Sequence, residues 1–192
     1  SYPNDEFAAD ALYALGIAQE ALKQPEAAQA TFASFQQKHG KHALVTEVRM
    51  RQAELLFNKA DYVAAQALYA QVSGVKDFAL ADTAMLRQAR CLYELNKYEE
   101  AGAIYWNMPR LFPDTKHYDT AVLAGSKCYY LTGKYGPARQ GLEIVAKRGG
   151  TEVPEAKQWI ARTYLKEKNP DQALSVLEDA LRAHASSPLY PQ

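Results

Sequence analysis

Apolar residues recur every three or four positions along most of the chain, which is the period of one face of an α-helix. Leu12 and Leu15 show this spacing in the first part of the sequence, and Ala28, Phe32 and Phe35 show it in the next part. A β-strand would instead alternate apolar and polar residues. The pattern therefore predicts an all-α protein.

Short polar breaks divide the helical pattern into pairs of segments. Pro25 and Pro170 fit the first turn of a helix, where a missing N–H costs nothing, and Asp61 and Asn169 suit N-cap positions. Longer breaks separate one pair from the next. We expect the first helices of five pairs at about 5–22, 42–58, 78–95, 117–132 and 153–167, and their partners at 25–38, 61–73, 98–111, 135–148 and 170–184.

The pairs repeat one another. An alanine, here called the repeat alanine, recurs in each second helix: Ala28, Ala65, Ala101, Ala138 and Ala173. A small residue stands twelve positions before each one: Gly16, Ala53, Ala89, Ser126 and Ala161. A large residue stands four positions after each one: Phe32, Tyr69, Tyr105, Leu142 and Leu177. Because one hairpin cannot bury both of its faces, such units must stack to form a continuous core.

These columns of small and large residues resemble the tetratricopeptide repeat (TPR) pattern, and Pro113 matches a proline that often follows the second helix of that repeat. The resemblance implies a right-handed α-α superhelix of about five helix pairs, a single TPR array over residues 1–192. The repeats would cover about 5–40, 42–77, 78–113, 117–150 and 153–185. The first-helix tryptophan usual in the family is absent, and Arg49 and Lys157 hold its column in the second and fifth repeats.

The residues at the two ends of the chain indicate a fragment of a longer repeat array. Pro3 stands in the same column as Gly40 and Pro113, so residues 1–4 are expected to be the tail of a missing preceding repeat. The sequence after 184 lacks the polar capping helix that a solenoid normally needs. The alternative is that both are natural termini.

The composition excludes several classes of protein. Lys and Arg together number 22, as do Asp and Glu, so the formal net charge is zero and the long-range field of a non-specific nucleic-acid binder is missing. No apolar run reaches the length of a membrane span. No phosphate-binding glycine loop or nucleophile elbow occurs in the sequence. We therefore expect a non-enzymatic protein with no cofactor.

The histidines and cysteines give no sign of a metal or redox site. His39 and His42 stand at the end of a predicted helix with no acidic or cysteine neighbour to complete a metal shell, which favours exposed loop side chains. Cys91 and Cys128 occupy the same column of consecutive repeats, where stacked helices are too far apart for a disulfide. They are expected to be free, mostly buried thiols.

In arrays of the TPR kind the first helices line a concave groove, so their residues are the candidate ligand contacts. Eleven residues before the repeat alanine the last three repeats carry the basic residues Arg90, Lys127 and Arg162. Eight residues before it the middle three repeats carry the aromatic residues Phe57, Tyr93 and Tyr130. These columns are three apart and share one helix face. Apolar residues on the same side complete the predicted peptide-binding set: Tyr13, Met50, Leu86 and Leu123.

Two interpretations of this face remain open. In the first, the aromatic residues contact a peptide and the basic residues hold an acidic stretch or a C-terminal carboxylate. In the second, the aromatic residues pack between neighbouring helices and the basic residues pair with nearby carboxylates, as the four-residue spacing of Arg90 and Glu94 suggests.

The leading hypothesis is an interaction scaffold that binds a peptide or protein segment in the groove, with an acidic segment as one candidate. Two alternatives are that the protein self-associates through its uncapped ends, or that it is the regulatory portion of a larger protein. The repeat length and the Tyr-Pro and Phe-Pro endings resemble bacterial cell-envelope arrays, such as outer-membrane assembly lipoproteins and the periplasmic coordinator of the Tol–Pal system. That resemblance implies a periplasmic or envelope location, with the cytoplasm as the alternative.

Overall fold

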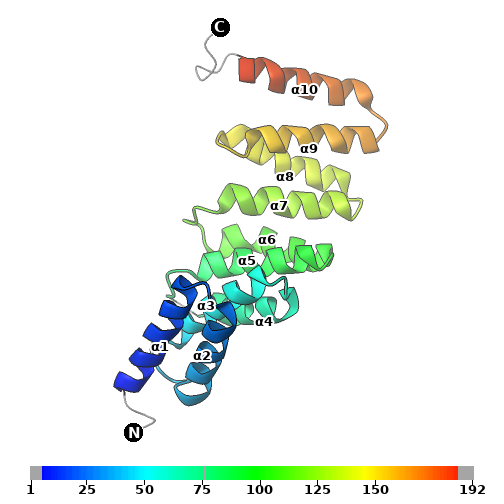
Figure 1. Cartoon of the computed structure of the whole chain (residues 1–192). Coiled ribbons are helices and arrows are strands. Elements are labelled where there is room, and N and C mark those ends of the chain that lie inside the picture. The colour runs from blue at the N-terminus through cyan, green and yellow to red at the C-terminus, as the bar shows by residue number, and fades with distance from the viewer. Residues whose placement is uncertain (1–5, 76, 186–192) are drawn as a thin grey trace. The chain divides into compact units, whose positions relative to one another are not determined.

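The computed structural model describes residues 6–75 and 77–185, and this part of the chain folds into α-helices without strands (Figure 1). The helices are α1 (Glu6–Ala21), α2 (Pro25–Lys38), α3 (Val45–Asn58), α4 (Tyr62–Ser73), α5 (Ala81–Glu94), α6 (Tyr98–Leu111), α7 (Tyr118–Leu131), α8 (Tyr135–Arg148), α9 (Val153–Lys166) and α10 (Pro170–Ala185). The predicted all-α class is confirmed for these residues. Residues 1–4, expected to be the tail of a preceding repeat, lie outside the described ranges.

The second helices begin and end within a residue of their predicted limits, whereas two first helices begin later than predicted. α3 starts at Val45 and α5 at Ala81, each three residues after the expected start. Turns occupy the difference: the Val45 N–H donates to the His42 carbonyl, and the Ala81 N–H donates to the Phe78 carbonyl. Each of these bonds spans only three residues, so the chain turns there before it becomes helical.

One turn residue in every hairpin adopts a left-handed backbone conformation. It stands five positions before the repeat alanine, and the φ angles lie between 57° and 77°: Lys23, Ala60, Asn96, Gly133 and Lys168. Glycine and asparagine adopt this conformation readily, whereas lysine and alanine do so at a steric cost. In at least three hairpins, helix packing therefore imposes the left-handed turn. The residue types at these positions do not predict this conformation.

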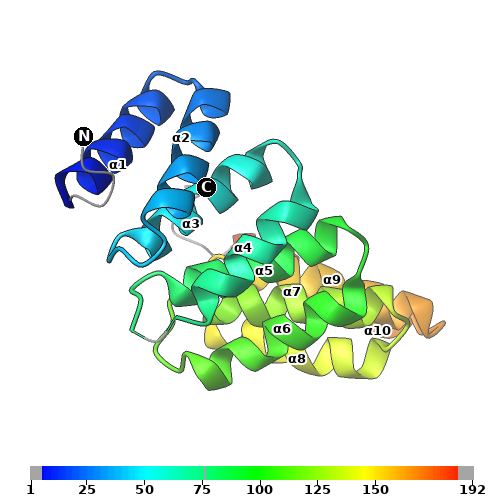
Figure 2. The same ribbon diagram turned by 90° about the horizontal axis from the view of Figure 1, so that it is seen from below.

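The chain divides after Leu95 into two compact units, so that the boundary falls between α5 and α6. In the first unit, α1 packs on α2, α2 on α3, α3 on α4 and α4 on α5 (Figures 1 and 2). In the second unit, α6 packs on α7 and the sequence of neighbours continues to α10. Each helix thus packs mainly on its neighbours along the chain.

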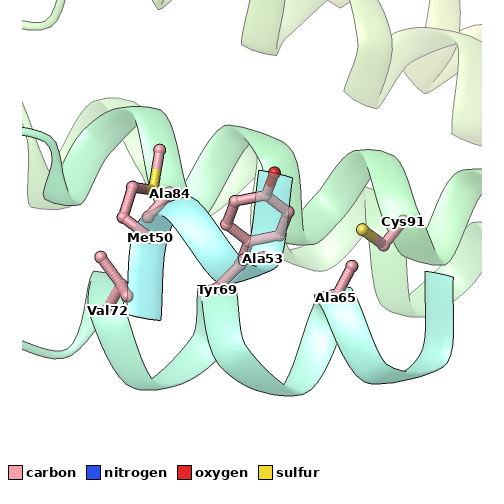
Figure 3. Packing of buried hydrophobic residues seen from close by; sticks show 7 residues of the cluster. All are labelled: Met50, Ala53, Ala65, Tyr69, Val72, Ala84 and Cys91. Carbon is pink, nitrogen blue, oxygen red and sulfur yellow. The ribbon is translucent and has the colours of Figure 1, made fainter. Parts of the chain in front are cut away.

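The core of the first unit follows the small and large columns. Phe32 of α2 is fully buried, and the backbone at Gly16 of α1 lies so close to its ring that a Cβ there would overlap the ring carbons. In the next hairpin the buried ring of Tyr69 lies beside Ala53, in a cluster that includes Met50 and Cys91 (Figure 3). The pairing of a small first-helix residue with a large second-helix residue is thus observed in two successive hairpins.

The core of the second unit is built in the same way, with Leu142 and Val145 of α8 packed in one cluster with Ala156 and Ile160 of α9. All four side chains are at most 5% exposed. Cys128 of α7 is also buried, as is Cys91 in the first unit, and both thiols are free, as expected. Burial raises the pKa of Cys91 to about 12 and that of Cys128 to about 11.

Candidate functional site

On the face formed by α7 and α9 in the second unit, two cations lie near one half-buried tryptophan. These helices are the first helices of consecutive hairpins, and they lie side by side. The Lys127 Nζ lies 5.3 Å from the centre of the Trp159 ring, and the Arg162 Cζ lies 4.4 Å from it. Tyr130 packs edge-on against the same ring, with the ring centres 5.1 Å apart. We call Lys127, Tyr130, Trp159 and Arg162 the α7–α9 cluster.

A carboxylate already occupies one side of this cluster. The Lys127 Nζ donates to Glu155 Oε1 over 2.8 Å, and the Trp159 Nε1 donates to the same oxygen over 3.2 Å. The hydrogen bond from Lys127 holds the pKa of the Glu155 carboxyl below its usual range, against the opposing effect of partial burial. Lys127 is therefore largely neutralised by a residue of the chain itself.

Arg162 is placed differently. Its side chain is exposed, and within residues 6–75 and 77–185 no carboxylate oxygen lies within 4.0 Å of its guanidinium. Its partner is the Trp159 ring, and a guanidinium stacked on an aromatic face keeps its N–H donors available. This side of the α7–α9 cluster therefore offers a positive charge to a ligand.

The corresponding face of the first unit is balanced in charge. Arg51 of α3 donates to Glu20 of α1 over 3.1 Å and to the Tyr13 hydroxyl over 3.3 Å, and it also pairs with Glu47 within α3. Its guanidinium Cζ lies 5.9 Å from the centre of the Tyr13 ring. Tyr13, a predicted groove residue, is thus part of a contact between successive first helices.

The other predicted residues of the first unit make similar contacts. Arg90 pairs with Glu94 on its own helix, with 2.7 Å between Nε and Oε1, and its guanidinium lies over the Tyr93 ring at 5.4 Å. Phe57 of α3 lies under the guanidinium of Arg87 of α5 at 5.2 Å. In the first unit, these basic residues therefore contact a carboxylate or aromatic rings of the chain itself, as expected if the face serves packing between helices.

Burial removes two of the predicted residues from the accessible face. Met50 and Leu123 were expected to add apolar surface to the groove, but they are 6% and 5% exposed and belong to the cores of the two units. Leu86 is half-buried. The physical reason is that the side chains of Met50 and Leu123 pack in the cores of their units, whereas Tyr13 and Leu86 of the same column are only half-buried.

The sequence analysis missed the residues that connect successive first helices. Arg51, Arg87 and Trp159 all stand fourteen positions before a repeat alanine. Each reaches back to the preceding first helix: Arg51 to Glu20, Arg87 to Glu54 over 3.4 Å, and Trp159 to Lys127 and Tyr130. A signal was present, because this column lies one helical turn before the basic column on the same face.

The described residues carry no group of three or more His, Cys, Asp or Glu side chains that could hold a metal ion. Among the same residues, no helix is both long and apolar enough to cross a bilayer.

Family models described as tetratricopeptide repeat match residues 10–42, 50–113 and 154–185. Together these segments cover most of the chain and include parts of both units. The chain belongs to the tetratricopeptide repeat family. Its hairpins with left-handed turns and paired small and large residues are therefore TPR hairpins.

Solved structures of similar fold include several TPR proteins. MamA from Desulfovibrio magneticus RS-1 (residues 41 to the end) is 14% identical with a TM-score of 0.74, over 94% of this chain and 97% of that one. PilF of Pseudomonas aeruginosa is 18% identical with a TM-score of 0.65, over 93% and 78%. YrrB, described as a TPR protein with an unusual peptide-binding site, is 14% identical with a TM-score of 0.70, over 89% and 84%. No curated protein matches the sequence.

Proposed function

We propose that this TPR protein is a non-enzymatic scaffold whose α7–α9 cluster binds an acidic peptide segment of a partner protein. The observation that carries the proposal is the exposed Arg162 guanidinium, held on the Trp159 ring and without a carboxylate partner among the described residues. A TPR fold is consistent with an interaction scaffold, and the description of YrrB as having a peptide-binding site supports a peptide as ligand.

The chemistry of the cluster favours an extended acidic segment over a basic one. Arg162 and Lys127 both lie against the Trp159 ring, so a peptide segment with two carboxylates could place one near each cation and an apolar residue near the ring. Glu155 is the one carboxylate bonded to the cluster within the described residues, and it would have to share Lys127 with the ligand.

The first unit, taken by itself, carries a separate set of candidate contact residues on its first helices. Its candidates are the predicted residues that are not fully buried: Tyr13, Phe57, Leu86, Arg90 and Tyr93. Because Arg90 is already paired with Glu94, we expect these residues to contribute apolar contact more than charge. We also propose a bacterial cell-envelope setting, which rests on the resemblance of the repeat length and repeat endings to envelope arrays.

Binding is best measured with synthetic ten-residue peptides in which Asp and Glu alternate with Ala and Leu, and with the same peptides carrying Lys in place of the acids. The variant K127Q/R162Q removes both cations and should weaken binding of the acidic peptide by about ten-fold, since exposed charge-assisted contacts contribute about 0.5–1 kcal/mol each. The variant K116Q/K147Q is the matched control, because it removes two exposed lysines elsewhere in the same unit.

A second variant reverses the direction of the effect. Glu155→Gln frees Lys127 and removes a negative charge from the cluster, so it should tighten binding of the acidic peptide by about three-fold. Unchanged affinity in K127Q/R162Q, or weaker acidic-peptide binding in E155Q, would refute the assignment.

A further inference from the structure

Among the described residues, the outer face of α1 is exposed at positions that are buried in the other four repeats. Ala11 stands seventeen residues before its repeat alanine and is exposed, whereas its four counterparts are fully buried: Val48, Ala84, Ala121 and Ala156. Leu15, Ala18 and Leu22 continue the same apolar side, and Leu15 and Leu22 are 48% and 68% exposed.

The outer face of α10 is likewise exposed at a position that is buried in the other second helices. Leu177 follows its repeat alanine by four positions and is 38% exposed, whereas its counterparts are at most 2% exposed: Phe32, Tyr69, Tyr105 and Leu142. Leu174 and Leu181 stand one turn to either side of it and are 59% and 68% exposed. Three large apolar side chains of α10, the last helix in Figure 1, are therefore exposed among the described residues.

Inside the units, the helix face that α10 leaves open packs on the next first helix. Arg139, one position after its repeat alanine, donates to Thr163 and pairs with Glu167 of α9. In the first unit, Ser73 stands eight positions after its repeat alanine and donates to Gln88 of α5 over 3.3 Å. The columns at one and eight positions after the repeat alanine thus meet a following first helix, and Phe32, at four positions, packs in one cluster with Val48 and Leu55 of α3.

The same pairing applied to the two open faces brings apolar residues together. Ser73 contacts Gln88 within the first unit. On the open faces, Leu181 of α10 stands at the position equivalent to Ser73, and Leu15 of α1 stands at the position equivalent to Gln88. Arg139, one position after its repeat alanine, contacts Thr163 and Glu167. On the open faces, Leu174 of α10 stands at the position equivalent to Arg139. Ala18 of α1 and Leu22, just after α1, stand at the positions equivalent to Thr163 and Glu167. Positions that pair through polar groups within the units are leucine or alanine on both open faces.

The charges agree with this pairing as well. Lys127 of α7 pairs with Glu155 of α9, which stands eighteen positions before its repeat alanine. The equivalents are Arg162 of α9, exposed and without a carboxylate within the described residues, and Asp10 of α1, which is also exposed. One open face carries a cation without an ion pair within 4.0 Å among the described residues, and the other carries an anion in the matching column.

We propose that a second copy of this chain places its α1 on the face formed by α9 and α10, so that copies associate head to tail. The second copy is the occupant that fits, because both halves of the contact are on this chain and occupy columns that meet in the α4–α5, α8–α9 and α7–α9 contacts. The inference does not depend on peptide binding by the α7–α9 cluster, although Arg162 belongs to both surfaces.

Separate variants block the two faces. Leu15→Glu blocks the α1 face, and L174E/L181E blocks the α10 face; all three side chains are exposed, so the helices should still form. Val63→Glu is the control, because Val63 is 67% exposed on α4, away from both faces. Circular dichroism checks the fold, and sedimentation velocity at roughly 5–500 µM measures the mass, which depends on concentration when copies associate.

The wild-type chain and V63E should gain mass with concentration, whereas each blocked variant alone should stay monomeric. An equal mixture of L15E with L174E/L181E should form a dimer and nothing larger, since one intact pair of faces remains. A wild-type chain that stays monomeric up to the highest concentration overturns the proposal. So does a blocked variant that still dimerises alone, because that outcome indicates a symmetric contact.

A charge exchange tests the pairing itself. Asp10→Arg and Arg162→Asp should each weaken association by about three- to five-fold, and D10R/R162D should restore it. Failure of the double variant to recover would overturn the Arg162–Asp10 contact. The variant K127Q serves to separate the two proposals, because it should leave self-association unchanged while it weakens binding of the acidic peptide.

Discussion

Replacing Gly16 by alanine tests whether the small and large columns hold the hairpins together. In α1, an added Cβ would lie 2.7 Å from Phe32 Cζ, 2.8 Å from Cδ1 and closer still to Cε1. Carbon atoms normally approach to about 3.5–4.0 Å, so the ring would have to move by about 1 Å. Phe32 is fully buried and has no free space beside it to move into.

The expected magnitude follows from two opposing effects. Overpacking a core by a methyl group costs about 1–3 kcal/mol, whereas replacing glycine by alanine inside a helix gains up to about 1 kcal/mol. We expect Gly16→Ala to lower the free energy of unfolding by about 1–2 kcal/mol. The control is Gly136→Ala in the first turn of α8, where an added Cβ meets no atom within 4 Å apart from its chain neighbours, so that no core overlap arises.

The assay is urea unfolding followed by far-UV circular dichroism, with amide hydrogen exchange used to locate the loss in α1 and α2. A double-mutant cycle with Phe32→Leu identifies the cause, because the smaller side chain should relieve the overlap. The two substitutions should then be less destabilising together than the sum of their separate effects, by about 1 kcal/mol. If G16A were as stable as G136A, or if the two changes were additive, the packing argument would be wrong.

Three further predictions concern the thiols, a turn and a carboxylate. Because burial raises the pKa of Cys91 and Cys128 to about 12 and about 11, both thiols should react slowly with a thiol reagent in the native protein at pH about 8 and rapidly after unfolding; rapid native labelling of both would contradict this. Lys168→Gly should raise the free energy of unfolding by up to about 1 kcal/mol, because the residue has a φ of 59°, and a loss in urea titrations would count against the strain argument. The lowered pKa of Glu155 stabilises the fold above the unfolded value of about 4.3, and this stabilisation is lost as the pH falls through the folded value. Thermal unfolding of E155Q should therefore depend less on pH in this range than that of the wild type, and identical profiles would refute the assignment.

The sequence predicted most of the fold because helix packing imposes regular spacing on it. The repeat alanines and the columns around them located the second helices within a residue, since these positions are determined by contact between two helices. The starts of α3 and α5 could not be found in the same way. Residues such as His42 and Phe78 are compatible with either a turn or a first helical turn, and hydrogen bonds to neighbouring carbonyls decide between them.

The candidate site was predicted less completely. The basic and aromatic columns led to Lys127, Tyr130 and Arg162, which do lie around one ring, but the ring itself, Trp159, was missed. A single sequence shows which residues share a helix face, but it does not show how far a side chain reaches toward the preceding repeat. The burial of Met50 shows the same limit, because one column serves the groove or the core according to small rotations of the helix.

The five left-handed turn residues have a consequence for how such a protein can change. All five are exposed, so they take no part in the cores of the two units, and none of them belongs to the α7–α9 cluster. Exchanging lysine, alanine, asparagine and glycine at these points would alter the stability of one hairpin at a time without touching any recognition surface. Mutation at the turns can therefore change the stability of a hairpin, while mutation on the helix faces changes its ligand contacts. A repeat family can then diversify its partners while each repeat remains folded.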